Sequence, residues 1–94
     1  MSTIKVPEYL DVQEDRIVIT LARPFDVNGA KLTTITMREP TLKDQRLAAA
    51  IEGSDVEREV KIFANLTEVS TQDLDRLPLK SYVRLQRAYV LFLT

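Results

Sequence analysis

The sequence contains no cysteine and no histidine. Without cysteine the chain can form no disulfide and perform no thiol chemistry, so we expect a protein of the cytoplasm and not of an oxidising, secreted environment. Without histidine it lacks the commonest general base and the commonest metal ligand. The only glycines, Gly29 and Gly53, stand at an expected turn and an expected helix end, which leaves none for a glycine-rich phosphate loop. Few classes of enzyme are compatible with these absences.

Long apolar runs and a strong charge of one sign are missing as well. No segment approaches the ~20 consecutive apolar residues that cross a bilayer, and the N-terminus lacks the basic region and apolar run of a signal peptide. The formal net charge of −1 argues against general electrostatic binding of nucleic acid. With 94 residues, of which 45% are hydrophobic, we expect one small domain of modest stability, and therefore a homo-oligomer.

The segment 16–38 has the pattern of a β-hairpin. Apolar residues alternate with less apolar neighbours over 17–21, and residues 32–37 are rich in threonine and isoleucine, so both arms have the two-residue period of strands. A further short edge strand is expected at Ile4–Val6, within a polar lead-in of residues 1–15.

The turn between the two strands has two interpretations. A two-residue turn at Asn28 and Gly29 would place Leu21 opposite Thr36, apolar against polar. A three-residue loop from Val27 to Gly29, with Gly29 left-handed after a type I turn, keeps apolar residues opposite each other. We therefore predict the three-residue loop and a positive φ at Gly29. The register then expected pairs Leu21 with Ile35 and Ile19 with Met37.

Helices are expected to dominate the rest of the chain. Pro40 cannot continue a central strand, and Thr41 with Asp44 resembles a capping box that begins a helix. Ser54 with Glu57 repeats this pattern. We expect an α+β fold, with an N-terminal antiparallel β-hairpin followed by three or four α-helices in a small bundle. The expected helices lie within a helical part at 41–94 and span about 42–52, ending at Gly53, then 54–66, 71–77 and 78–93.

The last expected helix, which begins at Pro78, is apolar around more of its circumference than one packed face requires. Leu85 and Phe92 lie outside its broad apolar face, and a second apolar strip implies a second contact. The helix that begins at Ser54 instead has a single apolar stripe. The broad face of the last helix consists of Leu79, Tyr82, Val83, Gln86, Tyr89, Val90 and Leu93, and the stripe of the earlier helix consists of Val56, Val60, Phe63 and Ala64.

Charged residues form one conspicuous group. Lys80, Arg84 and Arg87 fall at i, i+4 and i+7, so they form a basic stripe on the last helix. We interpret the stripe as a solvated edge beside a buried face; the sharper alternatives are contact with an acidic partner, with nucleic acid, which three charges without an aromatic platform disfavour, or with an anionic membrane. Two carboxylate pairs have members on different sides of their helices and are interpreted as solvated, not catalytic or metal-binding; they are Asp73 with Asp75 and Glu57 with Glu59. The residues alone therefore predict a small interaction module without metal or cofactor.

Two motifs in the sequence resemble those of a known protein family. The first consists of Leu21, Pro24, Gly29, Leu32, Ile35, Met37, Arg38, Glu39, Pro40, Thr41 and Asp44, and the second of Leu66, Gln72, Asp73, Leu74, Leu77, Tyr82 and Leu85. Together they cover roughly residues 19–93, and the chain resembles the small tail assembly chaperones of Mu-like and related contractile-tailed bacteriophages and their prophages. Ser81 departs from the pattern, because an acidic residue often precedes the tyrosine, and the lead-in lies outside it.

The resemblance implies a chaperone that binds the long, largely helical tape measure protein and keeps it soluble during tail assembly. It implies a protein of the host cytoplasm that is absent from the finished virion, that has no catalytic residue, and that often has a longer frameshifted form. Because an over-apolar helix can dock against another helix, the partner-binding residues hypothesised are Tyr82, Leu85, Tyr89, Phe92 and Leu93. Two alternatives stay open: a structural tail subunit that oligomerises and stays in the virion, and, less favoured, a small DNA-binding regulator.

Overall fold

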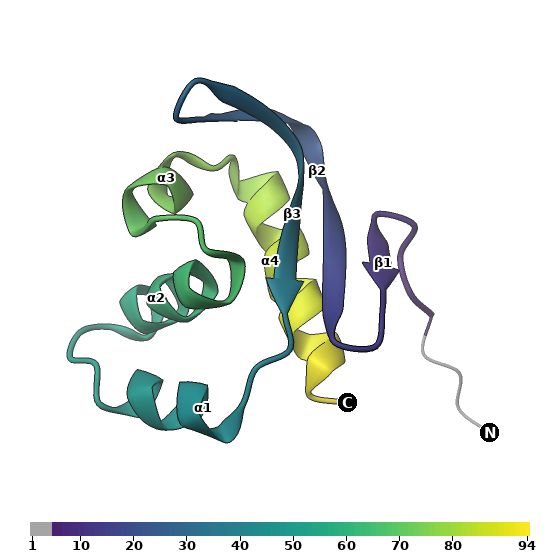
Figure 1. The fold of residues 1–94 in the computed structure, drawn as a ribbon. Coiled ribbons are helices and arrows are strands. Elements are labelled where there is room, and N and C mark those ends of the chain that lie inside the picture. Colours follow the sequence, from purple (N-terminus) through teal and green to yellow (C-terminus); the bar gives the residue numbers. More distant parts are fainter. Residues whose placement is uncertain (1–4) are drawn as a thin grey trace.

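The computed structural model describes residues 5–94, in which a three-stranded antiparallel sheet packs against helices (Figure 1). The α+β architecture expected from the sequence is confirmed, with the hairpin ahead of the helices. In Figure 1, α4 runs behind the sheet while α1, α2 and α3 gather to its left. The strands are β1 (Leu10–Val12), β2 (Arg16–Val27) and β3 (Ala30–Arg38), and the helices are α1 (Leu42–Ala49), α2 (Asp55–Thr67), α3 (Thr71–Arg76) and α4 (Leu79–Phe92).

A two-residue turn joins β2 to β3, so the predicted three-residue loop is wrong. Val27 pairs with Ala30, and the intervening Asn28 and Gly29 have φ angles of 51° and 82°. Two consecutive positive φ angles characterise the type I′ turn, whose twist matches that of the flanking strands and whose favoured sequence is Asn-Gly. The positive φ predicted for Gly29 is confirmed.

A bulge in β2 explains how a two-residue turn still keeps apolar residues opposite each other. Thr20 pairs with Thr34 but Phe25 pairs with Leu32, so four residues of β2 lie opposite one residue of β3. Pro24, which has no N–H to donate to a ladder, lies in this bulge. The predicted register is therefore wrong: beyond the bulge Ile19 pairs with Ile35 and Ile17 with Met37, not Leu21 with Ile35 and Ile19 with Met37.

The N-terminal edge strand lies later in the chain than predicted. Val6, in the segment predicted as a strand, belongs to none, and Ile4 lies outside the described residues. Instead, a turn closed by a hydrogen bond from the Leu10 N–H to the Pro7 carbonyl, 3.0 Å, leads into β1, where Leu10 pairs with Ile19. This places the lead-in beside β2, on the side opposite β3.

Hydroxyl side chains begin the first three helices, and those of the first two are the ones that the sequence predicts. Thr41 accepts from the Asp44 N–H at 3.3 Å while the Asp44 carboxylate accepts from the Thr41 N–H at 2.8 Å, which completes a capping box. Ser54 and Ser70 likewise accept from the backbone N–H three residues on. α1 ends a few residues earlier than predicted, and Gly53 takes a positive φ of 128° in the loop that follows.

One face of the sheet is buried under helices and the other is open. Ile17, Ile19 and Met37 are 0% exposed, as is Phe63 of α2 packed against them, whereas Thr34 on the other face is exposed. This alternation is typical of an antiparallel sheet covered on one side. The core consists of Leu10, Ile17, Ile19, Leu21, Phe25, Ile35, Met37, Phe63, Leu66, Val69, Leu74, Leu77, Leu85 and Ala88.

The apolar face of α2 is rotated from the stripe predicted. Phe63 is buried as expected, but Val56 is 68% exposed and Leu66, outside the predicted stripe, is 2% exposed. α2 packs on β3, and its buried residues lie in its C-terminal half whereas Val56 in its first turn is exposed.

Candidate partner-binding surface

α4 lies against the inner face of the sheet through small side chains. Ser81 and Ala88 are 0% exposed, and so is Leu85 between them. The Ser81 hydroxyl accepts a hydrogen bond from the Ala22 N–H, 3.0 Å away in the β2 bulge. Small residues let the helix and the strand approach closely, and the hydroxyl satisfies a donor that the bulge removes from the ladder.

The face of α4 turned away from the sheet is mainly apolar, and most of it is exposed; its one polar residue, Gln86, contacts Glu59 of α2. Leu79 is 74% exposed, Val90 56% and Leu93 64%. Val83 and Gln86, both partly exposed, complete a row whose intervals along the helix are four, three, four and three residues. This is the heptad spacing with which one helix packs against another. These five residues are called the α4 seam below.

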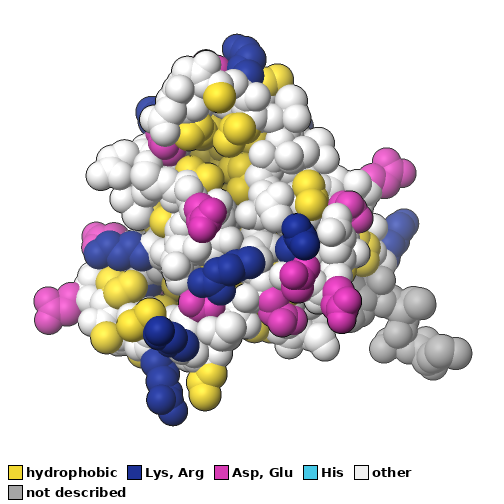
Figure 2. Space-filling model, viewed as in Figure 1, with side chains coloured by type: hydrophobic (Ala, Val, Ile, Leu, Met, Phe, Trp, Pro, Cys, Tyr) yellow, Lys and Arg dark blue, Asp and Glu magenta, His cyan; other side chains and the backbone are white. Residues whose placement is uncertain are grey.

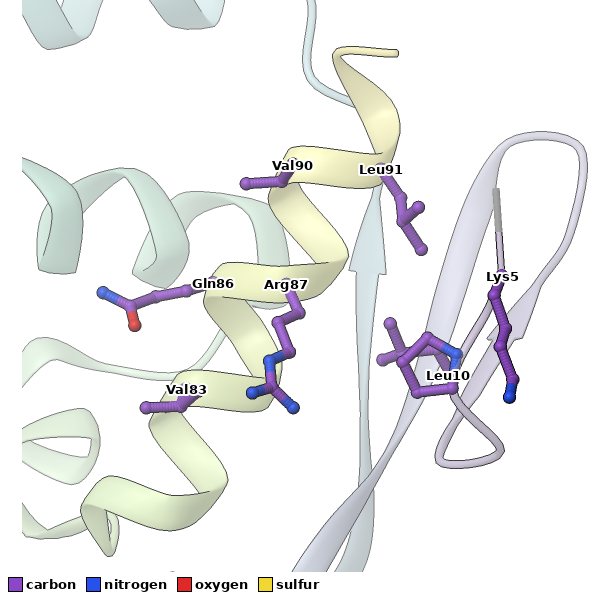
Figure 3. A pocket seen from close by; sticks show the side chains of 8 residues that line it. Lys5, Leu10, Val83, Gln86, Arg87, Val90 and Leu91 are labelled. Atoms are coloured by element: carbon purple, nitrogen blue, oxygen red, sulfur yellow. The ribbon is translucent and has the colours of Figure 1, made fainter. Parts of the chain in front are cut away.

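A groove of about 450 Å³ runs beside the α4 seam, between α4 and the lead-in (Figure 3). Leu10 and Leu91 point toward each other across it. One wall comes from the lead-in and the start of β1, and the other comes from α4, so the groove exists only where these two segments lie side by side. Its lining consists of Lys5, Pro7, Leu10, Val83, Gln86, Arg87, Val90 and Leu91.

Tyr82 and Tyr89 lie on the side of α4 that faces α2. Both rings pack on Phe63, with centroid distances of 5.6 and 5.5 Å. The Tyr82 hydroxyl donates to Glu59 Oε1 at 2.7 Å, and Gln86 donates to the same oxygen at 2.8 Å. Burial, reinforced by the Glu59 carboxylate, raises the pKa of Tyr82 above its usual value. The two tyrosines therefore join α4 to α2.

The basic stripe of α4 is only in part the solvated edge that was predicted. Arg84 donates to the Thr20 carbonyl at 2.8 Å, and its guanidinium lies 4.2 Å from the centre of the Tyr9 ring. Arg87 donates to the Tyr9 hydroxyl, while Lys80 is exposed. The two arginines thus hold the lead-in against α4. The sequence pattern missed this contact because Tyr9 lies in a segment without periodicity.

The five residues predicted to bind a partner differ in their exposure to solvent. Leu93 is 64% exposed, and Tyr82, Tyr89 and Phe92 are partly buried. Leu85 is 0% exposed, so its predicted position outside the packed face of the helix is wrong, because this face is the one that contacts the sheet. Leu85 therefore cannot reach a partner in this fold, and partner binding by the other four stays a prediction.

The orientation of α4 about its axis explains why Leu85 is buried while residues predicted on the packed face are exposed. Leu79 and Val90, predicted on the packed face, are more than half exposed, because the helix turns Ser81, Leu85 and Ala88 to the sheet. Two small residues seven positions apart mark the side on which a helix approaches another element most closely. This signal could have located the buried face from the sequence.

Within residues 5–94, no group of three or more acidic side chains could hold a metal ion. No helix in this part of the chain is long and apolar enough to span a membrane. Near the seam, the Glu59 carboxylate is occupied by the donors from Tyr82 and Gln86. The most exposed side chains of the seam, Leu79, Val90 and Leu93, are hydrocarbon, and on the side of the lead-in the charged residues of the groove are basic.

Comparison with known proteins identifies the family. Residues 18–94 match the model of a family described as phage tail assembly chaperone proteins, E, or 41 or 14. Because the match extends over most of the chain, the protein belongs to this family, and the resemblance found in the two motifs is confirmed. The matched part contains the α4 seam but not β1 or the lead-in. No curated protein and no solved structure matches the chain.

Proposed function

We propose that this member of the phage tail assembly chaperone family binds the tape measure protein and keeps it soluble during tail assembly, without catalysing a reaction. It acts in the cytoplasm of the bacterial host and is not retained in the mature virion. The observation that carries the proposal is the α4 seam, a mainly apolar row with heptad spacing in which Leu79, Val90 and Leu93 are each more than half exposed.

The α4 seam suits a helical partner. Leu79, Val90 and Leu93 are each more than half exposed and lie on one side of one helix. Covering three such side chains contributes on the order of 5 kcal/mol before the cost of association is subtracted. Apolar anchors at helical spacing characterise helix-in-groove recognition. A long, largely helical tape measure protein, the partner that the family resemblance implies, offers matching apolar stripes.

We also propose that the chain self-associates through a different surface. Leu42 and Leu47 of α1 are 68% and 54% exposed, and a groove of about 160 Å³ separates α1 from α2 beside Leu47. Figure 2 shows hydrophobic side chains at the surface over this part of the molecule, at its lower left. A longer frameshifted form of the chain would be joined by the same contact.

Co-expression with the tape measure protein of the same phage tests the proposed function. We expect the tape measure protein to be insoluble alone, soluble with this chain, and co-eluted with it in chromatography with light-scattering detection. The double variant Leu79→Ser and Val90→Ser should lose co-elution while keeping its helical circular dichroism. The matched variant Leu42→Ser and Leu47→Ser, which removes similar exposed surface from α1, should retain co-elution. A tape measure protein that stays insoluble beside the wild-type chain would overturn the proposal.

The competing function is a structural tail subunit that oligomerises and stays in the virion. The outer edge of β3 favours it, because in the described sheet β3 pairs only with β2, and an open edge can accept a strand from another subunit. Mass spectrometry of purified particles separates the two functions. Abundant chain in the particle supports the structural subunit, and its absence supports the chaperone.

A further inference from the structure

The two walls of the groove beside the α4 seam differ in their relation to the family match. Its α4 wall lies within the matched residues 18–94, whereas the wall at Pro7 and Leu10 precedes them. We propose that the lead-in and α4 together form the docking site for an amphipathic α-helix whose apolar stripe is flanked by acidic residues. This inference rests on the proposed function and specifies which kind of segment of the partner is bound.

Tyr9 holds the lead-in in place before any partner arrives. Its ring lies under the Arg84 guanidinium at 4.2 Å, and its hydroxyl accepts from Arg87. Its carbonyl accepts from the Thr20 N–H at 2.8 Å, which attaches the backbone of the lead-in to β2. A wall that is already fixed loses little conformational entropy on binding, so the groove is preorganised for a ligand.

The interior of the groove suits hydrocarbon side chains. Leu10, only 5% exposed, lies opposite Leu91 across the groove, and Val83 and Val90 belong both to its lining and to the α4 seam. A volume of about 450 Å³ accommodates more than one aliphatic side chain. A helix that lies along the seam therefore places the edge of its apolar stripe in the groove.

The charges around the groove specify the flanks of that helix. The charged side chains in its lining, Lys5 and Arg87, are both basic. Lys80 lies seven residues before Arg87, on the same side of α4, and is exposed. The segment 78–94 contains no aspartate or glutamate. Acidic residues beside the apolar stripe of a partner helix would be attracted by these cations, and basic ones would be repelled.

A second copy of this chain, docked through its own α4 seam, does not supply a helix with acidic flanks. If two α4 seams paired antiparallel, Lys80 of one copy would lie near Arg87 of the other, like charge beside like charge. If they paired parallel, Tyr82 and Tyr89 would stand at the flanks, where the nearby Glu59 carboxylate already accepts from Tyr82 and Gln86 of its own chain. Pairing of two α4 seams therefore does not supply the acidic flanks, and we assign the docked helix to the tape measure protein of the proposed function.

Peptides tiled along the tape measure protein of the same phage provide the probe. Each peptide has about 30 residues, long enough to span α4 as a helix. Their binding to the full chain is measured by fluorescence anisotropy. We expect the bound peptides to be those with apolar heptads flanked by aspartate or glutamate, and their Kd to rise with salt, because exposed charges are screened.

Charge reversal tests the basic flank. Lys5→Glu combined with Lys80→Glu should weaken binding of the best peptide about tenfold. The matched control, Lys43→Glu combined with Lys61→Glu, makes the same change in net charge on α1 and α2 and should alter Kd by no more than about twofold. Equal binding by the wild type and the Lys5 and Lys80 variant, or a preference for basic peptides, would overturn the inference and leave the proposed function standing.

The contribution of the lead-in is tested at Tyr9. Tyr9→Ala should weaken peptide binding several-fold, and Tyr9→Phe, which keeps the ring under Arg84 but loses the bond from Arg87, should weaken it less. The graded loss distinguishes a docking role from unfolding, which circular dichroism monitors in both variants. Unchanged Kd in both variants contradicts the inference. It is also overturned if the wild type co-elutes with the whole tape measure protein but binds no single peptide, whereas failure of co-elution itself removes the proposed function.

Discussion

The guanidinium of Arg38 donates to both carboxylate oxygens of Asp44, at 2.7 and 2.9 Å, across the junction between β3 and α1. The Asp44 carboxylate also accepts from the Thr41 N–H at 2.8 Å and from Asn65 of α2 at 3.0 Å, and its side chain is only 10% exposed. Arg38, Thr41 and Asp44 of the first sequence motif therefore join a strand, a tight junction and two helices, and they stabilise the fold.

Replacing Asp44 should destabilise the protein markedly. We expect Asp44→Ala to lower the free energy of unfolding by about 2–3 kcal/mol, because a helix cap and charge-assisted hydrogen bonds are lost together. Urea denaturation measures the change. The control Asp55→Ala removes a fully exposed carboxylate that pairs with Arg58 within one turn, and should cost less than about 1 kcal/mol. Equal losses in the two variants would contradict a special role for Asp44.

The same carboxylate should make stability depend on acid pH. The hydrogen bond from Arg38 is the main reason that the pKa of Asp44 lies well below its usual value, outweighing desolvation. As the pH falls, the unfolded state takes up the proton first, so this contribution is complete above about pH 5, begins to be lost as the pH falls through about 4, and continues to be lost down to the lower pKa of the folded state. We expect a smaller loss of stability between about pH 5 and pH 3 in Asp44→Asn than in the wild type, measured by urea denaturation. Equal losses of stability in Asp44→Asn and in the wild type over this pH range would contradict this expectation.

Ser81 should contribute through its hydroxyl. Ser81→Ala leaves the Ala22 N–H of the β2 bulge without its acceptor, so we expect a loss of about 1–3 kcal/mol in the free energy of unfolding. Hydrogen exchange at Ala22 should accelerate more than at neighbouring strand amides. Lys80→Ala changes the adjacent, exposed residue of the same helix and should stay within about 0.5 kcal/mol of the wild type. A fully stable Ser81→Ala would mean that water replaces the hydroxyl.

Alanine substitutions at Leu85 and Leu93, both leucines of the last helical segment, should have opposite effects: one should lower stability and the other should weaken partner binding. Leu85→Ala opens a cavity at a residue with 0% exposure and should cost about 2–5 kcal/mol. Leu93→Ala, at 64% exposure, should cost less than about 1 kcal/mol and weaken binding of the tape measure protein instead. Thermal unfolding and co-elution are measured for both. The orientation of α4 would be wrong if the stability losses were reversed.

The hairpin turn should require Gly29 more than Asn28. A Cβ at Gly29 would meet no atom within 4 Å, so the cost of Gly29→Ala comes from its φ of 82° and should be about 1 kcal/mol. Asn28→Gly keeps a residue that favours positive φ and should change stability by less than about 0.5 kcal/mol. Urea denaturation of the two variants compares them. No loss in Gly29→Ala would argue against the type I′ turn.

Features that depend on a few neighbouring residues were predictable. The alternation over 17–21 indicated a strand, Pro40 with Thr41 and Asp44 indicated where the first helix begins, and Ser54 indicated the start of the next. Each follows from local geometry: side-chain period, a missing N–H, or a hydroxyl that reaches a backbone donor three residues on. The α+β class then followed from the order of these elements.

The register of the hairpin was not predictable in the same way. Counting from the turn assumes an unbroken ladder, but four residues of β2 around Pro24 bulge opposite a single residue of β3. The bulge is stabilised from outside the hairpin, since the Ala22 N–H bonds to Ser81, 59 residues further along the chain. A pattern within the two strands contains no information about that contact.

The sequence by itself determined the two strands of the hairpin, the helices that follow and where these begin, but not the edge strand β1; it also determined that the last helix has more apolar surface than one contact covers. Only the tertiary structure decided which side of that helix faces the sheet. With apolar residues around most of its circumference, α4 has several orientations of similar burial, and the close approach allowed by Ser81 and Ala88 selects one. The tertiary structure also decided that Tyr9 and α4 form a groove, because a contact between residues 78 positions apart depends on the packing of the elements between them.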